Sequence, residues 1–152
     1  MPPHTTIVLP AFNEEEALPV VVKDIRSVLG SDADILVVDD GSSDGTADAA
    51  RQLGCAVEVH PTNRGKGAAI RTGVAAASGE IVIIMDADAT YPAATIPAMV
   101  DLLEDNDFVR AERNIDASNT PAINRLGNVL LGKAMTSLDS GQGLVLVLIA
   151  LQ

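Results

Sequence analysis

Two aspartates that are separated by one residue, Asp86 and Asp88, directly follow a run of five apolar residues at positions 81–85. Such a run predicts a strand that is covered on both faces, as in a parallel sheet. Ligands of open α/β sheets bind at the carboxyl ends of the strands. Two carboxylates at that place offer the hard oxygen ligands that suit Mg²⁺ or Mn²⁺ bridging a diphosphate. The alternative is a solvated turn, because Asp is a common turn residue.

Three further polar segments accompany this pair. Residues 10–14 follow an apolar segment at 6–9, and residues 39–45 follow another at 35–38. Residues 63–67, Asn-Arg-Gly-Lys-Gly, bring positive charge and backbone N–H groups to the start of a predicted helix, which suits a phosphate. Their spacing is not that of a P-loop. The first strand also lacks a Gly-x-Gly-x-x-Gly after it, which disfavours a dinucleotide site.

Strands and helices alternate along the chain. Strands are predicted at 6–9, 35–38, 56–59 and 81–85, with a fifth beginning at 108–109, and helices at about 14–29, 46–53, 68–77, 96–104 and 121–138. Asn13 is the predicted N-cap of the first helix, after a turn at 10–13. This alternation indicates a doubly wound α/β fold, with a mainly parallel sheet and helices on both faces.

Composition limits the classes of function. The chain has 152 residues, which suits one domain, and its formal net charge of −11 argues against binding nucleic acid. Its single cysteine, Cys55, excludes an internal disulfide. The first residues do not resemble a secretory signal, so a cytoplasmic location is expected. Neither His4 nor His60 lies in a motif, and both are predicted to be incidental.

Four segments together resemble the inverting family 2 glycosyltransferases, which have the Rossmann-like GT-A fold that binds nucleotide diphosphate sugars. The segments are Leu-Pro-Ala-Phe-Asn-Glu at 9–14, Val-Val-Asp-Asp-Gly-Ser-Ser-Asp-Gly-Thr at 37–46, Asn-Arg-Gly-Lys-Gly at 63–67 and Met-Asp-Ala-Asp at 85–88. Residues 86–92, with Arg113 and Arg125, are similar to the dolichyl- or polyprenyl-phosphate mannose and glucose synthases. The resemblance covers roughly residues 6–144.

The resemblance implies a site for the nucleotide of the donor. Pro10, Phe12 and Glu14 would border the base, and Phe12 would offer it a ring face. Asp40 would accept a hydrogen bond from a base N–H. The alternative for Asp40 is a cap on the Gly-Ser turn that follows it.

The resemblance also implies a site for the diphosphate and its metal. Asp86 and Asp88 would hold Mg²⁺ or Mn²⁺, with Asp88 as the more direct ligand, and the metal would neutralise charge on the leaving diphosphate. Lys66 and Gly67 would lie near the nucleotide end of the site. A solvated surface lysine is the alternative for Lys66.

On the acceptor side, Arg113 and Arg125 match positions that hold the acceptor lipid's phosphate, a task that suits the planar guanidinium. Without the resemblance, both would be interpreted as surface arginines. The implied reaction is in-line attack on the sugar C1 with inversion. A phosphate acceptor is already ionised and needs no strong base, whereas an alcohol would need one, and Asp139 is the only late candidate.

The resemblance weakens near the end of the chain. The family pattern leads one to expect an Arg where Val145 stands, and the uncharged segment that follows ends at residue 152. We therefore expect a GT-A nucleotide-sugar domain at 1–143, incomplete on its acceptor side, and an apolar tail at 144–152. As an exposed strand, residues 144–151 would form an edge prone to aggregation. The alternative is that they pair within the sheet.

These expectations favour transfer of a hexose from GDP-mannose or UDP-glucose to polyprenyl or dolichyl phosphate, with peripheral contact at the inner face of a membrane. The alternative is a non-catalytic nucleotide-sugar-binding or interaction module. A nucleotidyltransferase is disfavoured, because residues 10–13 are not the Gly-rich basic loop that such enzymes place after the first strand.

Overall fold

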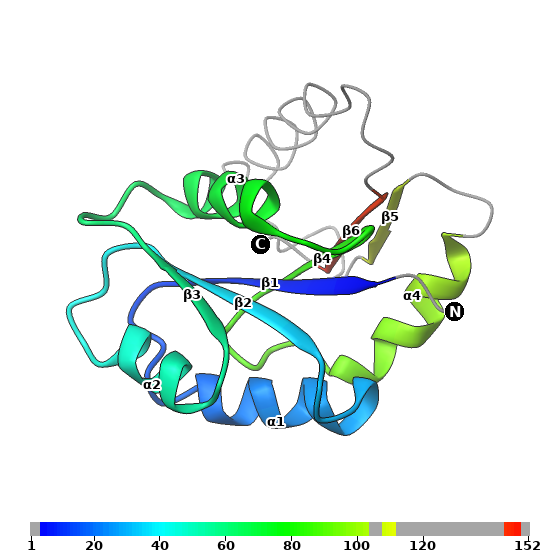
Figure 1. Ribbon diagram of the computed structural model, residues 1–152, viewed down its shortest axis with the longest axis horizontal. Coiled ribbons are helices and arrows are strands. Elements are labelled where there is room, and N and C mark those ends of the chain that lie inside the picture. Colours follow the sequence, from blue (N-terminus) through cyan, green and yellow to red (C-terminus); the bar gives the residue numbers. More distant parts are fainter. Residues whose placement is uncertain (1–3, 104–107, 112–144, 150–152) are drawn as a thin grey trace, which may run out of the picture.

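The computed structural model describes residues 4–103, 108–111 and 145–149. Its sheet has the strand order β3-β2-β1-β4-β6-β5, and every neighbouring pair is parallel (Figure 1). The strands are β1 (Thr5–Ala11), β2 (Asp34–Asp39), β3 (Ala56–Val59), β4 (Ile81–Met85), β5 (Phe108–Ala111) and β6 (Val145–Ile149). The predicted parallel sheet is therefore confirmed.

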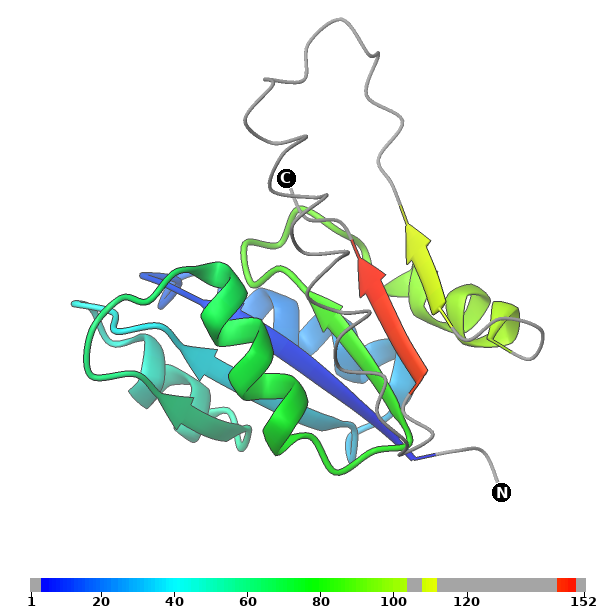
Figure 2. The ribbon, with the colours of Figure 1, turned by 90° about the horizontal axis from the view of Figure 1, so that it is seen from above.

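Helices cover both faces of this sheet, as predicted. They are α1 (Leu18–Leu29), α2 (Thr46–Gln52), α3 (Lys66–Ala76), the short 3₁₀ helix η1 (Ala93–Thr95) and α4 (Ile96–Leu102), which continues from η1. Figures 1 and 2 show α3 on one face and α1 and α2 on the other. Successive strand residues point to opposite faces, so Ile7 and Leu9 pack with α1 while Val8 packs with α3.

The first helix begins later than the sequence predicts. Asn13 is not its N-cap, because α1 starts at Leu18 after Ala17. Pro19 explains the difference, since it is tolerated in the first turn but could not donate to a carbonyl one turn earlier in a longer helix. Asn13 instead has a φ of 56° and accepts a hydrogen bond from the Ser43 N–H. It therefore ties the loop after β1 to the loop after β2.

Two other boundaries differ from prediction near the loops. β1 continues through Pro10 to Ala11, where a turn was expected, because both residues pair in register with β2. α3 begins at Lys66, two residues earlier than predicted, after Gly65 with a φ of 86°. Lys66 and Gly67 thus form the first turn of a helix rather than part of a loop. By contrast, β3 and β4 have the predicted bounds.

β6 has a neighbour on both sides, β4 and β5. The expected exposed edge at 144–151 is therefore wrong for the described part of that segment, and the alternative, pairing within the sheet, is confirmed. The helix predicted at 121–138 lies outside the described residues. None of the helices that the structure describes has the length and apolar character needed to cross a bilayer.

Candidate active site

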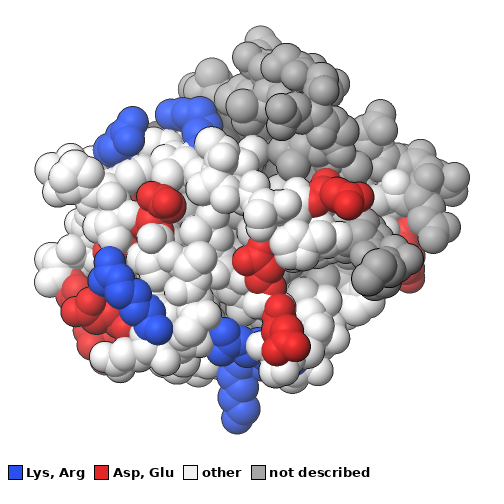
Figure 3. Space-filling view, in the orientation of Figure 1, with Lys and Arg blue, Asp and Glu red and all other residues white. Residues whose placement is uncertain are grey.

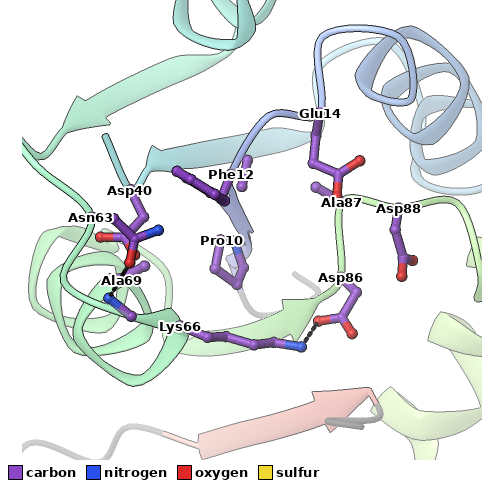
Figure 4. A pocket seen from close by; sticks show the side chains of 12 residues that line it. Pro10, Phe12, Glu14, Asp40, Asn63, Lys66, Ala69, Asp86, Ala87 and Asp88 are labelled. Carbon is purple, nitrogen blue, oxygen red and sulfur yellow. Dashed lines mark hydrogen bonds and ion pairs between the residues drawn. The ribbon is translucent and has the colours of Figure 1, made fainter. Parts of the chain in front are cut away.

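A pocket of about 330 Å³ opens where the loops after β1, β2 and β4 meet the start of α3 (Figure 4). Its walls come from four chain segments that lie far apart in the sequence. They are lined by Pro10, Ala11, Phe12, Glu14, Asp40, Asn63, Gly65, Lys66, Ala69, Asp86, Ala87 and Asp88. The sheet order explains the meeting, because β2, β1 and β4 are adjacent and parallel. Their carboxyl ends therefore lie at one edge.

Asp40 forms one end of the pocket and is 3% exposed. Its Oδ1 accepts hydrogen bonds from the Arg64 N–H at 3.0 Å and from the His60 ring, whose Nδ1 lies 2.6 Å away. Its Oδ2 accepts the Gly65 N–H at 2.8 Å. Burial alone would raise the pKa of Asp40, but the hydrogen bonds from His60, Arg64 and Gly65 outweigh it and hold that pKa below its usual value. Asp40 is therefore a carboxylate near neutral pH.

His60 connects this carboxylate to α3. Its side chain is buried, with Nδ1 on Asp40 and Nε2 2.9 Å from the Thr72 Oγ1. The prediction that His60 is incidental is therefore wrong. The register of the sheet could have revealed it, because Asp39 pairs with Val59 and the next residues, Asp40 and His60, fall side by side.

Gly41 allows the loop after β2 to approach the segment around Thr62 closely. A Cβ on Gly41 would lie 2.5 Å from the carbonyl carbon of Thr62, and its φ of +74° is one that L side chains rarely adopt. The same approach brings the Arg64 and Gly65 N–H groups to Asp40. Asp40 thus organises the segment at Arg64 and Gly65. The alternative, that Asp40 caps the Gly-Ser turn after it, is wrong, because Asp39 Oδ1 accepts the Ser42 N–H there at 2.9 Å.

The loop after β1 is held by the loop after β2. The Asn13 N–H donates to Ser42 Oγ and the Glu14 N–H donates to Thr46 Oγ1, both at 2.9 Å. Phe12 precedes these anchored residues, lines the pocket and is 47% exposed. Figure 4 shows its ring on the same side of the pocket as Asp40. An exposed aromatic face on a fixed backbone is available for stacking.

Asp86 forms the other end of the pocket and is 9% exposed. Its Oδ1 lies 2.6 Å from the Lys66 Nζ, and among the described residues this ammonium is the only partner of that buried oxygen (Figure 4). Burial raises the pKa of Asp86 above its usual value; Lys66 acts to lower it, and Asp88 raises it further. The ion pair therefore compensates the burial of this carboxylate only in part.

Asp88 lies at the same end and is exposed. Its Oδ1 accepts hydrogen bonds from the Thr90 N–H at 3.0 Å and from the Thr90 hydroxyl at 2.6 Å. Ala89 between them has a φ of 59°. A left-handed conformation is unfavourable for alanine by roughly 1–2 kcal/mol, so the tight Asp88–Thr90 turn holds a strained residue beside the pocket.

Glu14 adds a third carboxylate to this end of the pocket. Burial raises the pKa of Glu14, and the nearby charges of Asp88, Asp44 and Asp86 raise it further. Among the residues that the structure describes, only Lys66, paired with Asp86, brings a cationic side chain to the pocket lining. Negative charge is therefore in excess here among the described residues.

A divalent cation fits the chemistry of this end. Asp86 and Asp88 offer carboxylate oxygens of the kind that Mg²⁺ and Mn²⁺ prefer. Within the part of the chain that the structure describes, the Lys66 ammonium is the only partner of the buried Asp86 Oδ1. The part of the chain that the structure describes contains no cluster of three or more His, Cys, Asp or Glu side chains placed to hold a metal. Asp86 and Asp88 would thus supply part of the coordination, and phosphate and water the rest.

The structure brings together most of the predicted site residues. Pro10, Phe12, Glu14, Asp40, Lys66, Asp86 and Asp88 all line the pocket, whereas Gly67 lies next to it in the first turn of α3. Lys66 was predicted to lie near the nucleotide end. Its backbone lies at the Asp40 end, but its ammonium contacts Asp86 at the other end of the pocket. Because of this ion pair, the alternative of a solvated surface lysine does not describe it. Arg113, Arg125 and Asp139 lie outside the described residues.

Charge on the surface is distributed differently from charge in the pocket. Figure 3 shows acidic and basic side chains interspersed over one face, with no broad basic area among the described residues there.

Known proteins with similar sequences include sugar transferases. The family model of glycosyl transferase family 2 matches residues 6–137. A dolichyl-phosphate hexose transferase of Haloferax volcanii is 33% identical over 129 residues, which cover 84% of this chain and 56% of that protein. An undecaprenyl-phosphate 4-deoxy-4-formamido-L-arabinose transferase of Serratia proteamaculans is 34% identical over 142 residues, covering 85% of this chain and 43% of that protein.

Solved structures agree with this grouping. A mannosyltransferase from Pyrobaculum calidifontis in complex with GDP-Man and Mn²⁺ is similar with a TM-score of 0.65 and 28% identity, covering 74% of this chain and 36% of that one. Glucosyl-3-phosphoglycerate synthase from Mycobacterium tuberculosis, in complex with Mn²⁺, UDP and its product, has a TM-score of 0.66 and 25% identity, covering 97% and 69% of the two chains. The predicted GT-A fold is confirmed.

The chain spans about half the length of the curated relatives that it matches. The family match nevertheless covers most of the chain and includes every residue that lines the pocket. The chain therefore belongs to glycosyl transferase family 2.

Proposed function

We propose that this chain carries the donor site of an inverting glycosyltransferase, which transfers a hexose from GDP-mannose or UDP-glucose to a polyprenyl or dolichyl phosphate. The observation that carries the proposal is the composition of the pocket. One end has an exposed aromatic ring beside an ionised carboxylate, and the other has three carboxylates and a lysine. A nucleotide diphosphate has matching parts, a base at one end and a metal-bound diphosphate at the other.

At the base end, Phe12 stacks on the nucleobase and Asp40 accepts one of its N–H groups. Pro10 borders the base from the same loop, whereas Glu14, which the resemblance also assigned to the base, lies with Asp86 and Asp88 at the diphosphate end. Because the Asn13 and Glu14 backbone is already anchored to the loop after β2, the ring needs little reorganisation on binding. A pre-positioned site of this kind loses less entropy when the ligand arrives.

At the diphosphate end, Asp86 and Asp88 hold Mg²⁺ or Mn²⁺, with Asp88 as the more direct ligand. When bound, the cation neutralises negative charge that builds up on the leaving diphosphate. Lys66 lies within reach of the same place, because its ammonium is already on Asp86. It binds a phosphate oxygen there, whereas Gly67 stays with the Lys66 backbone at the Asp40 end, where the first turn of α3 offers its positive end.

On the acceptor side, Arg113 and Arg125 hold the lipid's phosphate, and Asp139 follows them in the chain. A phosphate acceptor is ionised near neutral pH, so positioning and electrostatics account for most of the rate. The relatives named for dolichyl- and undecaprenyl-phosphate transfer support such an acceptor. A lipid acceptor places the enzyme in peripheral contact with a membrane, at its cytoplasmic face.

The test is formation of a lipid-linked sugar. The chain is incubated with radiolabelled GDP-mannose or UDP-glucose, polyprenyl phosphate and Mn²⁺, and the lipid is extracted and counted. Label in the lipid phase, lost in Asp88→Ala, is the expected result. Binding of a nucleotide diphosphate without any product from either donor would contradict transfer by this chain.

A second candidate function is a nucleotide-sugar-binding module without catalysis. It is favoured by one observation, that the described residues of the pocket match a nucleotide diphosphate and none of them is assigned to an acceptor. The same assay separates the two functions. Nucleotide binding without product supports the module, whereas product excludes it.

A further inference from the structure

We propose that His60 is a positioning residue of the donor site, which acts through Asp40 to limit the pocket to a single hydrogen-bond acceptor for the nucleobase. The inference rests on the proposed function, because it concerns how the same pocket distinguishes one base from another. The prediction of site residues did not include His60, and it does not line the pocket.

The hydrogen-bond partners of His60 fix the role of its Nδ1. Asp40 is an ionised carboxylate, which can only accept, so Nδ1 carries a proton and donates a hydrogen bond to Asp40 Oδ1, 2.6 Å away. Nε2 lies 2.9 Å from the Thr72 Oγ1, a hydroxyl that can donate or accept. The backbone N–H of His60 donates to the Asp39 carbonyl at 2.8 Å. Ring and backbone are therefore fixed between β2 and α3.

Counting acceptors shows what this arrangement leaves for a ligand. A carboxylate has about four acceptor positions. His60 and the Arg64 N–H use the two of Oδ1, and the Gly65 N–H uses one of Oδ2. One position remains, on Oδ2, and Asp40 lines the pocket. A single fixed acceptor suits a ring N–H, such as N3–H of uracil or N1–H of guanine.

Loss of His60 would release this restriction. Oδ1 would then lack one of its two donors, and the carboxylate could rotate about its last torsion to offer either oxygen to the pocket. It would also lose one of the hydrogen bonds that keep it ionised despite burial. Both changes weaken discrimination between a base that has the ring N–H and one that lacks it, without altering the diphosphate end.

Two near-isosteric variants separate positioning from simple filling of space. The amide nitrogen of His60→Asn can take the place of Nδ1 and donate to Asp40. That of His60→Gln takes the place of Nε2 instead, toward Thr72. If His60 acts through Asp40, Asn restores its effect and Gln does not. If it only fills space, the smaller Asn restores no more than Gln.

The experiment is a calorimetric titration of the chain with UDP and GDP in Mn²⁺, followed by the ring-N-methylated form of whichever binds more tightly. Wild type is expected to prefer the parent nucleotide by about tenfold or more, or about 1.4 kcal/mol. His60→Ala and His60→Gln should reduce this preference to about twofold or less, and His60→Asn should retain most of it. Affinity for inorganic pyrophosphate with Mn²⁺ should stay the same in all variants.

The outcomes distinguish this inference from the function on which it rests. If wild type prefers the parent nucleotide and both His60→Ala and His60→Gln keep that preference, His60 has no such role, while the donor site stands. If wild type binds neither UDP nor GDP, the proposed function fails instead. Should His60→Ala not fold, as judged by circular dichroism, the Asn and Gln variants decide. Equal selectivity in those two would overturn the proposal.

Discussion

The two ends of the pocket each contain a buried carboxylate, but the two carboxylates differ in how many partners they have. At the base end, Asp40 receives hydrogen bonds from His60 and from two backbone N–H groups, and its pKa is held below the usual value. At the metal end, the Asp86 Oδ1 has a single lysine as its described partner, and the pKa values of Asp86 and Glu14 are raised.

This difference indicates which end is complete before the ligand arrives. Buried charge is stable only when it is paired and hydrogen-bonded. The base end meets that condition with its own chain, so its geometry is fixed in advance. The metal end does not, and the missing positive charge is what a divalent cation supplies.

Asp88→Ala is expected to have the largest effect, because it removes a proposed metal ligand from the incomplete end. Affinity for UDP or GDP in Mn²⁺ should fall by roughly 100-fold, about 2.7 kcal/mol, as measured by calorimetry. Since Asp88 is exposed, the free energy of unfolding should change by no more than about 0.5 kcal/mol. Glu80→Gln, exposed just before β4 at the opposite end of the strand, is the matched control. An equal loss in both variants would contradict a metal role for Asp88.

Asp40→Asn should act on the complete end, and on stability as well as on binding. An amide can place one oxygen but not two toward the N–H donors of Arg64 and Gly65 and the ring of His60. The free energy of unfolding should fall by about 2 kcal/mol, measured by urea denaturation near neutral pH. Stability equal to wild type would show that the base end is not held together by this carboxylate.

The difference in free energy of unfolding between wild type and Asp40→Asn should depend on pH, because the pKa of Asp40 is lowered in the folded protein. The folded protein binds this proton less readily than the unfolded chain, so the stabilisation is fully present above the unfolded pKa of about 3.9 and is lost as pH falls through the folded value. The gap between wild type and Asp40→Asn should therefore narrow below about pH 4. Asp101→Asn, at an exposed position on α4, is the control for the change from Asp to Asn itself.

Phe12→Ala should have a smaller effect, in free energy, than either aspartate variant. Stacking of a base on an aromatic ring contributes about 1–3 kcal/mol, so affinity for the preferred nucleotide should fall by roughly tenfold while affinity for pyrophosphate is unchanged. Val20→Ala removes another exposed apolar side chain, 59% exposed on α1, and should change neither. A loss of pyrophosphate binding in Phe12→Ala would show that the two ends are not independent.

Lys66→Met should have the smallest effect. It should raise the affinity for the metal alone and lower the affinity for the nucleotide diphosphate. Lys66 pairs with the Asp86 carboxylate that a metal would bind, so its removal should raise the affinity for Mn²⁺ alone by about threefold. Affinity for the nucleotide diphosphate should fall by a similar factor, because one phosphate partner is lost. Lys23→Met, exposed on α1, is the control. If the affinities for Mn²⁺ and for the nucleotide diphosphate both rose or both fell, Lys66 would not move from Asp86 to a phosphate on binding.

The sequence predicts the fold better than it predicts the base end of the pocket, because the fold depends on local patterns and the base end on contacts between strands. Local patterns were sufficient for β3 and β4, whose bounds match the prediction, because apolar runs and turn residues act over a few positions. Local patterns did not predict the start of α1, because the apolar spacing does not show that Pro19 confines the helix to the residues after Ala17. His60 was missed because its role depends on the register of β2 and β3.

At the metal end, the residue types of Asp86 and Asp88 predicted the site and the pocket confirms that both lie there. The contact of Lys66 with Asp86 could not be predicted, since it joins the start of α3 to the end of β4 across the pocket. Long side chains reach several ångströms from their backbone position, so a motif locates the Cα of a lysine but not its charge. Electrostatic balance between segments therefore requires the structure.

The central claim, a base end that is complete and a metal end that is not, can be tested by titrating the wild-type chain with UDP and GDP, once with Mn²⁺ and once with a chelator. We predict that the preference for one nucleotide over its ring-N-methylated form is the same in both conditions, while overall affinity rises by about tenfold or more with Mn²⁺. Affinity that does not respond to Mn²⁺, or base preference that appears only when Mn²⁺ is present, would contradict the account.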